Sequence, residues 1–463
     1  MRDPYLLPPT SLGTMAGYVG HYGGEGIDAA RALGPAALRA TVEAAGLRGR
    51  DATATAVAAR WSAAAENGDD SGPRYLVANG TDSEPGSFVD HTLLRSNPFQ
   101  VIEGLVIAAI AIGAREAFIV IRHSFETEYS ILTDALAEAE LAGWFERLSV
   151  KCVRAPEEYL VGEDRAALEV IEGRSPLPAR LAPHVDGLFA RVDRDLRSLD
   201  QLPDRPNPTV VETVETLANL APLVRNGPVW FRSMGTAVSP GHILCTVTGD
   251  VSRHDVAEVR LGRPLLEVLE EVGCGFSPTG QPRAVLSGVS SPVLTRSRLA
   301  APMCWEGLSA VGASLGRAAF IVYGDGSDMI EVAHQVAAFL YVESCGLCPA
   351  CKFGGGEVTA YLARLVSGIG SVRDVEALGA RLAVLADGRR CDLPLHQRDV
   401  VSSILRAFPE DVMGSTRPRH TARPTVMSRI EDLTGGQATW DQLQSRKRAD
   451  WVLEDRPVQL TRC

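Results

Sequence analysis

The chain has 463 residues, of which 45% are hydrophobic and 22% are charged. A single hydrophobic core stops growing at about 250–300 residues, so this length predicts two or three domains and excludes a peptide or a simple linker. The net charge of −11 argues against a general binder of nucleic acid or of anionic membranes, because such proteins need a basic face. We therefore expect the partners to be proteins or small molecules.

No stretch of the sequence has the pattern of a membrane span or of a secretion signal. The longest apolar run, Leu105 to Ile112, is far shorter than the roughly 20 residues that cross a bilayer, and the N-terminus lacks a basic segment followed by an apolar one. These features predict a cytoplasmic protein that is not inserted in a membrane. In such a reducing compartment, clustered cysteines hold metal more often than they form disulfides.

The first half of the chain shows the alternation of an α/β fold. Residues 1–28 contain Gly and Pro without sustained periodicity, which predicts an extended arm. The elements expected after it are a helix at 29–45, a strand at 75–78, a helix at 98–113, a strand at 117–121, a helix at 131–142 and a strand at 149–153. Strand, helix and strand in this order favour a parallel sheet. A connection rich in Pro and Arg follows at 174–208.

The pattern changes after Pro240. Expected strands at 242–248 and 257–261, followed by a short helix at 264–272, fit a small β-grasp-like domain. Residues 327–408 have helical periodicity and predict a bundle, and the polar residues after it predict a flexible tail. The predicted organisation is an arm at 1–28, an α/β domain at 29–240, a β-grasp domain at 241–325, a helical domain at 326–410 and a tail at 411–463.

The sharpest local signal is a group of four cysteines. Cys345, Cys348 and Cys351 have the spacing C-x2-C-x2-C, and Cys391 follows further along the chain. Three thiolates in one loop can hold three corners of a cubane while a fourth arrives from elsewhere, so the pattern predicts a [4Fe–4S] cluster. Zinc is the main competitor, but its sites usually pair two C-x2-C knuckles. A chance grouping of surface cysteines is the remaining alternative, and the density of the group disfavours it.

The cysteine segment resembles a known signature. Residues 343–351 read E-S-C-G-L-C-P-A-C, which is similar to the E-S-C-G-x-C-x-P-C of the NADH-binding flavoprotein subunit of respiratory complex I and of NAD-linked hydrogenases and formate dehydrogenases. The proline stands one place earlier here. Further blocks resemble the family in the same order, namely Asn79 with 83–86, Gln100 with 102–104, 111–117, Tyr159 with 162–163 and 172–173, and 208–211 with 214–219.

This resemblance implies a fold, cofactors and site residues. The implied fold is a Rossmann-like flavin domain, a β-grasp domain and a C-terminal four-helix bundle that carries the cluster. The implied ligands of the [4Fe–4S] cluster are Cys345, Cys348, Cys351 and Cys391. The residues implied to bind FMN or NAD(H) are Asn79, Glu84, Tyr159, Gly162 and Glu163.

The flavin loop departs from the family pattern. The family holds FMN with G-R-G-G-A-G-F-P-T-G-x-K-W, in which glycines bring backbone N–H groups close to the flavin and its phosphate. Residues 49–61 read G-R-D-A-T-A-T-A-V-A-A-R-W here, so the run 52–61 is expected to be helical. Asp51 and Glu212 place carboxylates where the family has neutral donors, and Thr213 replaces an asparagine. We expect FMN to bind far more weakly than in ordinary family members.

The nicotinamide side is partly intact. Tyr159, Gly162 and Glu163 match the family, and Asp164 is a conservative replacement, whereas Arg165 stands where the family has a small hydroxyl residue. A solvated helix face is the competing interpretation of the two carboxylates. NAD(H) binding is therefore left open.

Two other features lie near the cysteines. His396 follows Cys391, and a histidine near a cluster can tune its potential; a surface or capping role is the more frequent one for it and for His334. The glycine run 354–356 has no strand before it, which disfavours a phosphate loop and favours close packing of backbone against the cluster.

These patterns predict an iron–sulfur electron-transfer subunit of a redox complex. Its cluster would pass single electrons between a partner's redox centre and an acceptor such as a ferredoxin. The first alternative is an active FMN-dependent NADH:acceptor oxidoreductase, and the second is a structural subunit whose helices the cluster staples together. The resemblance also implies a thioredoxin-like [2Fe–2S] partner, for which residues 241–323 and the surface near Cys391 are the expected docking faces.

Overall fold

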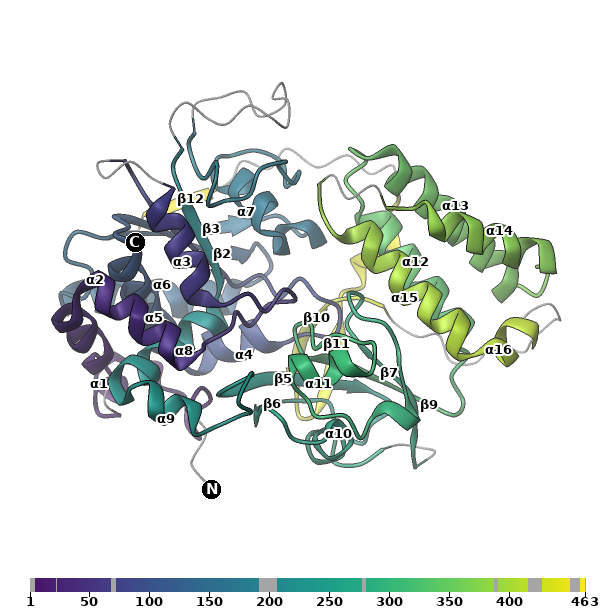
Figure 1. Ribbon diagram of the computed structural model, residues 1–463, viewed down its shortest axis with the longest axis horizontal. Helices are drawn as coiled ribbons and strands as arrows, with labels where there is room; N and C mark the ends of the chain where they lie inside the picture. Colours follow the sequence, from purple (N-terminus) through teal and green to yellow (C-terminus); the bar gives the residue numbers. More distant parts are fainter. Residues whose placement is uncertain are drawn as a thin grey trace.

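The computed structural model has three parts, a larger α/β part, a second sheet and a group of helices (Figure 1). It describes residues 5–21, 23–67, 72–190, 206–276, 280–386, 390–414, 427–449 and 459–462. Much of the predicted connection at 174–208 lies outside these residues.

The first sheet is parallel except at one edge. Its strands are Tyr75–Asn79 (β1), Glu116–Arg122 (β2), Ser149–Ala155 (β3), Thr209–Thr213 (β4) and Gln459–Arg462 (β12), in the order β12-β3-β2-β1-β4. β1 lies parallel between β2 and β4, β3 is parallel to β2, and β12 pairs antiparallel with β3. The prediction of an α/β fold built on a parallel sheet is therefore confirmed.

Helices cover both faces of this sheet. They are Met15–Val19 (α1), Glu25–Ala45 (α2), Val57–Glu66 (α3), Val89–Ser96 (α4), Pro98–Ile112 (α5), Glu126–Leu141 (α6), Asp164–Ile171 (α7), Val214–Asn226 (α8) and Pro228–Arg232 (α9), with a 3₁₀ turn at Tyr159–Gly162 (η1). Side chains alternate across the strands, so Leu76 and Ile119 enter the core beneath α5 whereas Val77 and Val120 enter the smaller core beneath α7. α5 is buried almost throughout because α2, α8 and β1 all pack against it.

The crossing of α5 and α8 depends on Gly104. A Cβ atom at this position would lie 1.9 Å from the Leu217 carbonyl oxygen, so only glycine allows the two backbones to approach this closely. We expect Gly104→Ala to cost about 1–3 kcal/mol through overpacking, which exceeds the roughly 1 kcal/mol that alanine gains in a helix. Thermal denaturation should show a lower midpoint for this variant.

A matched control for that experiment lies in another helix. Gly379 is also a helical glycine, but a Cβ atom there would have no described atom within 4 Å outside its own stretch of helix. Gly379→Ala should leave the midpoint unchanged or raise it. Equal midpoints for the two variants would contradict the packing role of Gly104.

The second sheet follows in the chain. Its strands are His242–Gly249 (β5), Asp255–Arg260 (β6), Pro282–Ser287 (β7), Leu294–Thr295 (β8) and Ala319–Gly324 (β9), in the order β6-β5-β9-β7-β8. Its helical elements are Leu265–Val272 (α10), Arg296–Arg298 (η2) and Trp305–Ala310 (α11). β5 and β9 are parallel, and the other pairs are antiparallel. Val285 and Phe320 face the core that contains α10.

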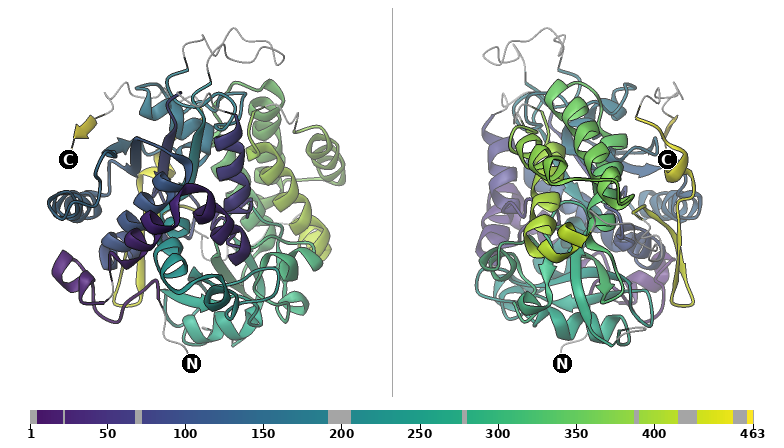
Figure 2. Two further views of the ribbon diagram at one scale, coloured as in Figure 1. Left: turned by 60° about the vertical axis from the view of Figure 1, so that its left-hand side comes forward. Right: turned by 90° about the vertical axis from the view of Figure 1, so that its right-hand side faces the viewer.

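The helical part packs on the other face of the second sheet. Its helices are Met329–Glu343 (α12), Pro349–Val366 (α13), Val372–Ala383 (α14), Leu393–Ala407 (α15) and Pro409–Gly414 (α16). Leu286 and Ile321 of the sheet share a core with Ile330 and Leu340 of α12. In the right-hand view of Figure 2 these helices face the viewer and lie above the second sheet. Among the described residues no single helix is long and apolar enough to cross a membrane, although the bent pair α4 and α5 passes that test jointly.

The predicted N-terminal arm is wrong in part, because helices occupy much of it. α1 lies inside the arm, and α2 begins at Glu25, earlier than the predicted residue 29. The Tyr18 hydroxyl donates a hydrogen bond of 2.6 Å to Glu103, and the backbone N–H groups of residues 5–7 donate to the Glu258 carboxylate. These partners are distant in the sequence, so they leave no periodic pattern.

The prediction of a flexible tail is also wrong for the described part. Residues 427–449, which we call the C-terminal segment, contain the hairpin Ile430–Thr434 (β10) and Gln437–Trp440 (β11) and a 3₁₀ turn at Leu443–Arg446 (η3). Ion pairs of Arg429 and Lys447 hold this segment on the rest of the chain. These charged contacts, and not an apolar face, hold the C-terminal segment. Its sequence therefore shows no apolar periodicity. Residues 415–426 and 450–458 lie outside the described residues.

Candidate functional site

The four predicted cluster ligands surround one small cavity. Cys345, Cys348 and Cys351 reach it from the turn between α12 and the first turn of α13, and Cys391 reaches it from the turn before α15. Gly346 has a φ of +81°, a conformation that lets the loop turn between the first two cysteines. The rest of the wall includes Leu160, Arg390, Leu393 and Pro394.

The donor set fits a [4Fe–4S] cluster. Among the described residues no three His, Cys, Asp or Glu side chains converge closely enough to hold a single metal ion, yet all four thiols line the same cavity. A cubane presents a separate iron to each thiolate, so its ligands stand further apart than the ligands of one zinc ion. Burial and the neighbouring thiols raise the pKa of Cys351 and of Cys391 to about 12. Metal binding at neutral pH must therefore displace protons from these thiols.

The glycine run after Cys351 packs against protein rather than against the cluster position. A Cβ atom on Gly354 would lie 2.8 Å from the Leu385 side chain, one on Gly355 2.9 Å from Gln397, and one on Gly356 2.9 Å from the Tyr341 ring. The three glycines thus bring α13 close to α12, α15 and residue 385. This corrects the predicted role of the run.

A larger cavity of about 350 Å³ adjoins the cluster cavity and shares Leu160, Cys391 and Leu393 with it. It lies at the carboxyl ends of β1 and β4, where Asn79 and Thr213 line it. Ligands of α/β sheets commonly bind at this edge. All the residues predicted to bind FMN or NAD(H) line this cavity, and so do the two residues that follow Glu163 in the sequence. They are Asn79, Glu84, Tyr159, Gly162 and Glu163, with Asp164 and Arg165.

Several of these side chains are committed to contacts inside the chain. Asn79 donates hydrogen bonds of 3.3 and 3.4 Å to the carbonyl oxygens of Val161 and Gly162. Glu163 accepts one of 3.1 Å from the Ala166 N–H as the N-cap of α7, and one of 2.6 Å from Arg165. Burial raises the pKa of Glu163 despite the Arg165 charge. A solvated helix face is therefore the wrong interpretation of this residue.

Tyr159 connects the two cavities. Its backbone N–H donates a hydrogen bond of 2.9 Å to the carboxylate of Glu343, which stands two residues before Cys345. Its hydroxyl donates one of 3.3 Å to Glu84 in the larger cavity. Glu84 also accepts a hydrogen bond of 2.5 Å from the Val289 N–H, and burial raises the pKa of Glu84. Tyr159 is thus hydrogen-bonded both to Glu84 in the larger cavity and to Glu343 just before the cysteine loop.

The loop at the position of the family's flavin loop is held by ion pairs. The Arg60 guanidinium contacts the Asp51 carboxylate and donates a hydrogen bond of 2.9 Å to Glu212. Asp51 in turn accepts hydrogen bonds from the N–H groups of Thr53, at 2.8 Å, and Ala54, at 2.9 Å. The predicted helix at 52–61 is wrong in its first half, because these bonds fold residues 51–54 into a turn and α3 begins only at Val57.

The carboxylates near Arg60 titrate very differently. Burial opposes ionisation of Asp51, but the Arg60 charge and the hydrogen bond from Thr53 hold the pKa of Asp51 below its usual value. Burial raises the pKa of Glu212 to about 8, although Arg60 opposes this shift. Asp51 is therefore the permanent counter-ion of Arg60. Sequence reasoning identified both replacement carboxylates but missed Arg60, which is 152 positions away from Glu212.

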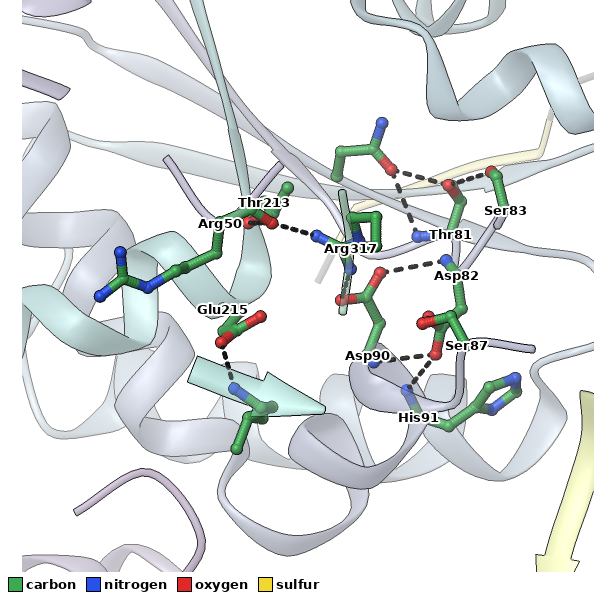
Figure 3. Close-up of polar contacts among 12 residues, drawn as sticks. Arg50, Thr81, Asp82, Ser83, Ser87, Asp90, His91, Thr213, Glu215 and Arg317 are labelled. Carbon is green, nitrogen blue, oxygen red and sulfur yellow. Dashed lines mark hydrogen bonds and ion pairs between the residues drawn. The ribbon is translucent and has the colours of Figure 1, made fainter. Parts of the chain in front are cut away.

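A second buried network joins the larger cavity to the second sheet (Figure 3). Arg317 donates hydrogen bonds of 2.6 Å to Asp90 and of 2.7 Å to the Arg50 carbonyl oxygen. Asp82 accepts hydrogen bonds from the N–H groups of Asp90 and His91. Burial raises the pKa of Asp90 to about 6 even beside Arg317. No sequence motif pointed to Arg317, because these partners are 227 and 267 positions away from it.

The two histidines differ in position. His396 lines the larger cavity near Cys391, and burial lowers its pKa, so that its ring is neutral at pH 7. Its Nδ1 atom is buried without a hydrogen-bond partner among the described residues. His334 lies on α12 and does not line either cavity. A surface role is therefore wrong for His396.

Two family models match the chain. Residues 42–222 match the Nuo51 FMN-binding domain, and residues 331–414 match the iron-sulfur binding region of NADH-ubiquinone oxidoreductase-F. The first match contains α3, β1 and the Arg60 ion pairs, and the second contains all four cysteines of the small cavity.

Curated relatives and a solved structure extend the similarity over most of the chain. The NADH-quinone oxidoreductase F 2 subunit of Rhizobium meliloti (strain 1021) is 33% identical over 348 residues, which cover 73% of this chain and 78% of the relative. The corresponding F subunit of Mycobacterium tuberculosis (strain ATCC 25618 / H37Rv) is 31% identical over 398 residues, covering 81% and 86%. The structure of an NAD+-reducing [NiFe]-hydrogenase in the H2-reduced state matches with a TM-score of 0.76 at 27% identity, covering 88% of this chain and 68% of that one.

Proposed function

The chain belongs to the family of the NADH-quinone oxidoreductase F subunit, and we propose that it transfers electrons through one [4Fe–4S] cluster within a larger redox assembly. The observation that carries the proposal is the convergence of four thiols on one cavity. The proposed ligands are Cys345, Cys348, Cys351 and Cys391. A bound cluster of this kind supplies single-electron transfer.

The surrounding residues fit this role. Lys352 donates a hydrogen bond of 2.8 Å to the Ser344 carbonyl oxygen, which fixes the loop and places a cation beside the thiolates. Leu160 and Leu393 are buried and form an apolar wall of the cluster cavity. On the outside, Leu347 and Phe353 are 39% and 72% exposed on either side of the loop. These two apolar side chains support a partner that docks over the cysteines.

The larger cavity does not fit FMN in the way the family pattern requires. Asp51 and Glu212 stand where neutral donors are expected, and Arg60 is bound to both of them. The proposed function therefore rests on the cluster alone. NADH oxidation by FMN bound with an altered loop is the second candidate, and the observation that favours it is the grouping of Asn79, Glu84 and Tyr159 around one cavity.

The proposed domains follow the three parts of the fold. The order β3-β2-β1-β4 supports a Rossmann-like domain at 29–240, and the order β6-β5-β9-β7-β8 with α10 after the first hairpin supports a β-grasp domain at 241–325. We propose residues 326–410 as the cluster domain. We also propose a cytoplasmic location. The proposed partner is a thioredoxin-like [2Fe–2S] protein or a ferredoxin.

Anaerobic purification of the full chain tests the function. We expect about four iron and four sulfide per chain, a cluster that dithionite reduces, and no flavin spectrum. Stoichiometric flavin with NADH-driven reduction of a dye would establish the second candidate instead. A cluster that no reductant reduces would indicate that it only staples the helices, and stoichiometric zinc without sulfide would contradict the cluster itself.

A further inference from the structure

The Arg60 guanidinium lies directly behind the wall of the larger cavity. It donates hydrogen bonds of 3.0 Å to the Thr53 hydroxyl and of 3.3 Å to the Val211 carbonyl oxygen, and both of these residues line the cavity. The Arg60 side chain is 17% exposed, whereas Glu212 is fully buried. An arginine in this place can bind two oxygens of a phosphate monoester with its planar fork of N–H donors.

Both terminal nitrogens of the Arg60 guanidinium already contact carboxyl groups of the same chain. One terminal nitrogen of Arg60 contacts Asp51 and the other contacts Glu212. The second oxygen of Glu212, Oε1, is buried without a hydrogen-bond partner among the described residues. A phosphate brought to Arg60 would therefore have to displace the Asp51 carboxylate and meet the unpaired Oε1 atom of Glu212.

The two arginines that line this cavity are also paired with carboxylates. Arg165 is bound to Glu163, and Arg317 is bound to Asp90 (Figure 3). Within the described lining of the cavity, each guanidinium thus has a carboxylate of its own. These positive charges, which could attract an anionic ligand, are neutralised inside the chain.

We propose that Arg60 is a latent phosphate-binding residue, which Asp51 and Glu212 occupy so that the cavity rejects a flavin phosphate. The inference deepens the proposed function and rests on it, because it explains why the cluster would work without a flavin on the same chain. It predicts that the site regains phosphate affinity when the two carboxylates are neutralised. The ion pairs themselves do not depend on the cluster, since Arg60 and its partners lie outside the cysteine cavity.

The experiment is a titration of FMN fluorescence with the full, cluster-loaded chain and with its Asp51→Asn/Glu212→Gln variant. Asparagine keeps an oxygen that accepts from the Thr53 and Ala54 N–H groups, so the turn should persist. We expect the variant to bind FMN at least tenfold more tightly than the unmodified chain. Riboflavin, which has no phosphate, should show no such gain. Adding Arg60→Gln to the variant should abolish the gain.

A second double variant controls for the replacement of one Asp and one Glu side chain. Asp255→Asn/Glu271→Gln neutralises two carboxylates that pair with Arg253 and Arg263 and do not line the cavity, and FMN affinity should not change in it. Tight FMN binding by the unmodified chain would overturn the proposal, as would a gain that survives Arg60→Gln or that riboflavin shares. If the double variant does not fold, Asp51→Asn alone should give a smaller gain, and no gain would overturn the proposal equally.

A failure here is distinguishable from a failure of the proposed function. Iron and sulfide are measured on the same samples, so that a chain without a cluster is recognised before the titration. The FMN affinities with and without Arg60→Gln are then compared on chains of equal cluster content, so that their difference reports on Arg60.

Discussion

Replacing Cys348 by serine should remove the cluster. Cys348 is the middle cysteine of the loop and the residue that precedes α13, so its thiolate links the metal site to the start of that helix. Because metal binding and folding are coupled in such sites, the variant should also loosen the helical part of the chain. We expect iron and sulfide to fall from about four each per chain to well below one. Chemical analysis of anaerobically purified protein measures this change.

Cys274 offers the matched control. It is exposed, stands just after α10 in the second sheet region, and does not line the cluster cavity. Cys274→Ser should therefore keep the full iron and sulfide content and an unchanged melting profile. A Cys348→Ser chain that retains four irons would remove this residue from the ligand set, and the loss of iron in both variants would point to damage during purification.

The grouping of the cysteines around one cavity could be predicted from the sequence because three of them form a local pattern. Three of the four cysteines lie within seven consecutive residues, and chain connectivity alone places them on one loop. Helix α5 could be predicted for a similar reason. The helix begins at Pro98 and ends before Gly113, which has a φ of +73°. Both residues directly flank the apolar run of the helix in the sequence.

The contacts of Arg60 could not be predicted in this way. Asp51 and Arg60 are near in the chain, but Glu212 joins them only because β4 lies beside β1 and brings its carboxyl end to the same edge of the sheet. Sequence reasoning could say that two carboxylates had entered the flavin site. It could not say that a cation inside the chain neutralises them, because that depends on the order of the strands.

The position of the C-terminal segment was missed for the same reason. The His254 N–H donates a hydrogen bond of 2.9 Å to the Gly436 carbonyl oxygen, Arg95 pairs with Asp432 at 2.8 Å, and Lys447 pairs with Glu343 at 2.8 Å. The segment thus touches the first sheet region, the second sheet region and the helical part. None of these partners is near it in the sequence, and its own composition is that of a solvated tail.

Arg429 should be the residue on which the attachment of this segment depends most. It pairs with Glu157 and with Asp441, each at 2.6 Å, and its side chain is only 10% exposed. Burial opposes ionisation of Glu157, but the charges of Arg122 and Arg429 outweigh it and lower the pKa of Glu157 to about 2. Breaking a buried pair from one side leaves an uncompensated charge, at a typical cost of about 3–5 kcal/mol. We expect Arg429→Ala to lower the thermal midpoint by several degrees and to speed hydrogen exchange in residues 427–449.

The control for this prediction is an arginine whose ion pair is exposed. Arg263 pairs with Glu271 at the surface, where the two side chains are 35% and 64% exposed. Such pairs contribute about 0–1 kcal/mol, so Arg263→Ala should change the midpoint little and leave exchange in the C-terminal segment unaltered. If both variants melt alike, the segment adheres through its hairpin and not through Arg429. A larger effect at Arg429, confined in exchange to residues 427–449 and the Glu157 region that it touches, would establish that this buried guanidinium fastens the C-terminal segment to the region of Glu157.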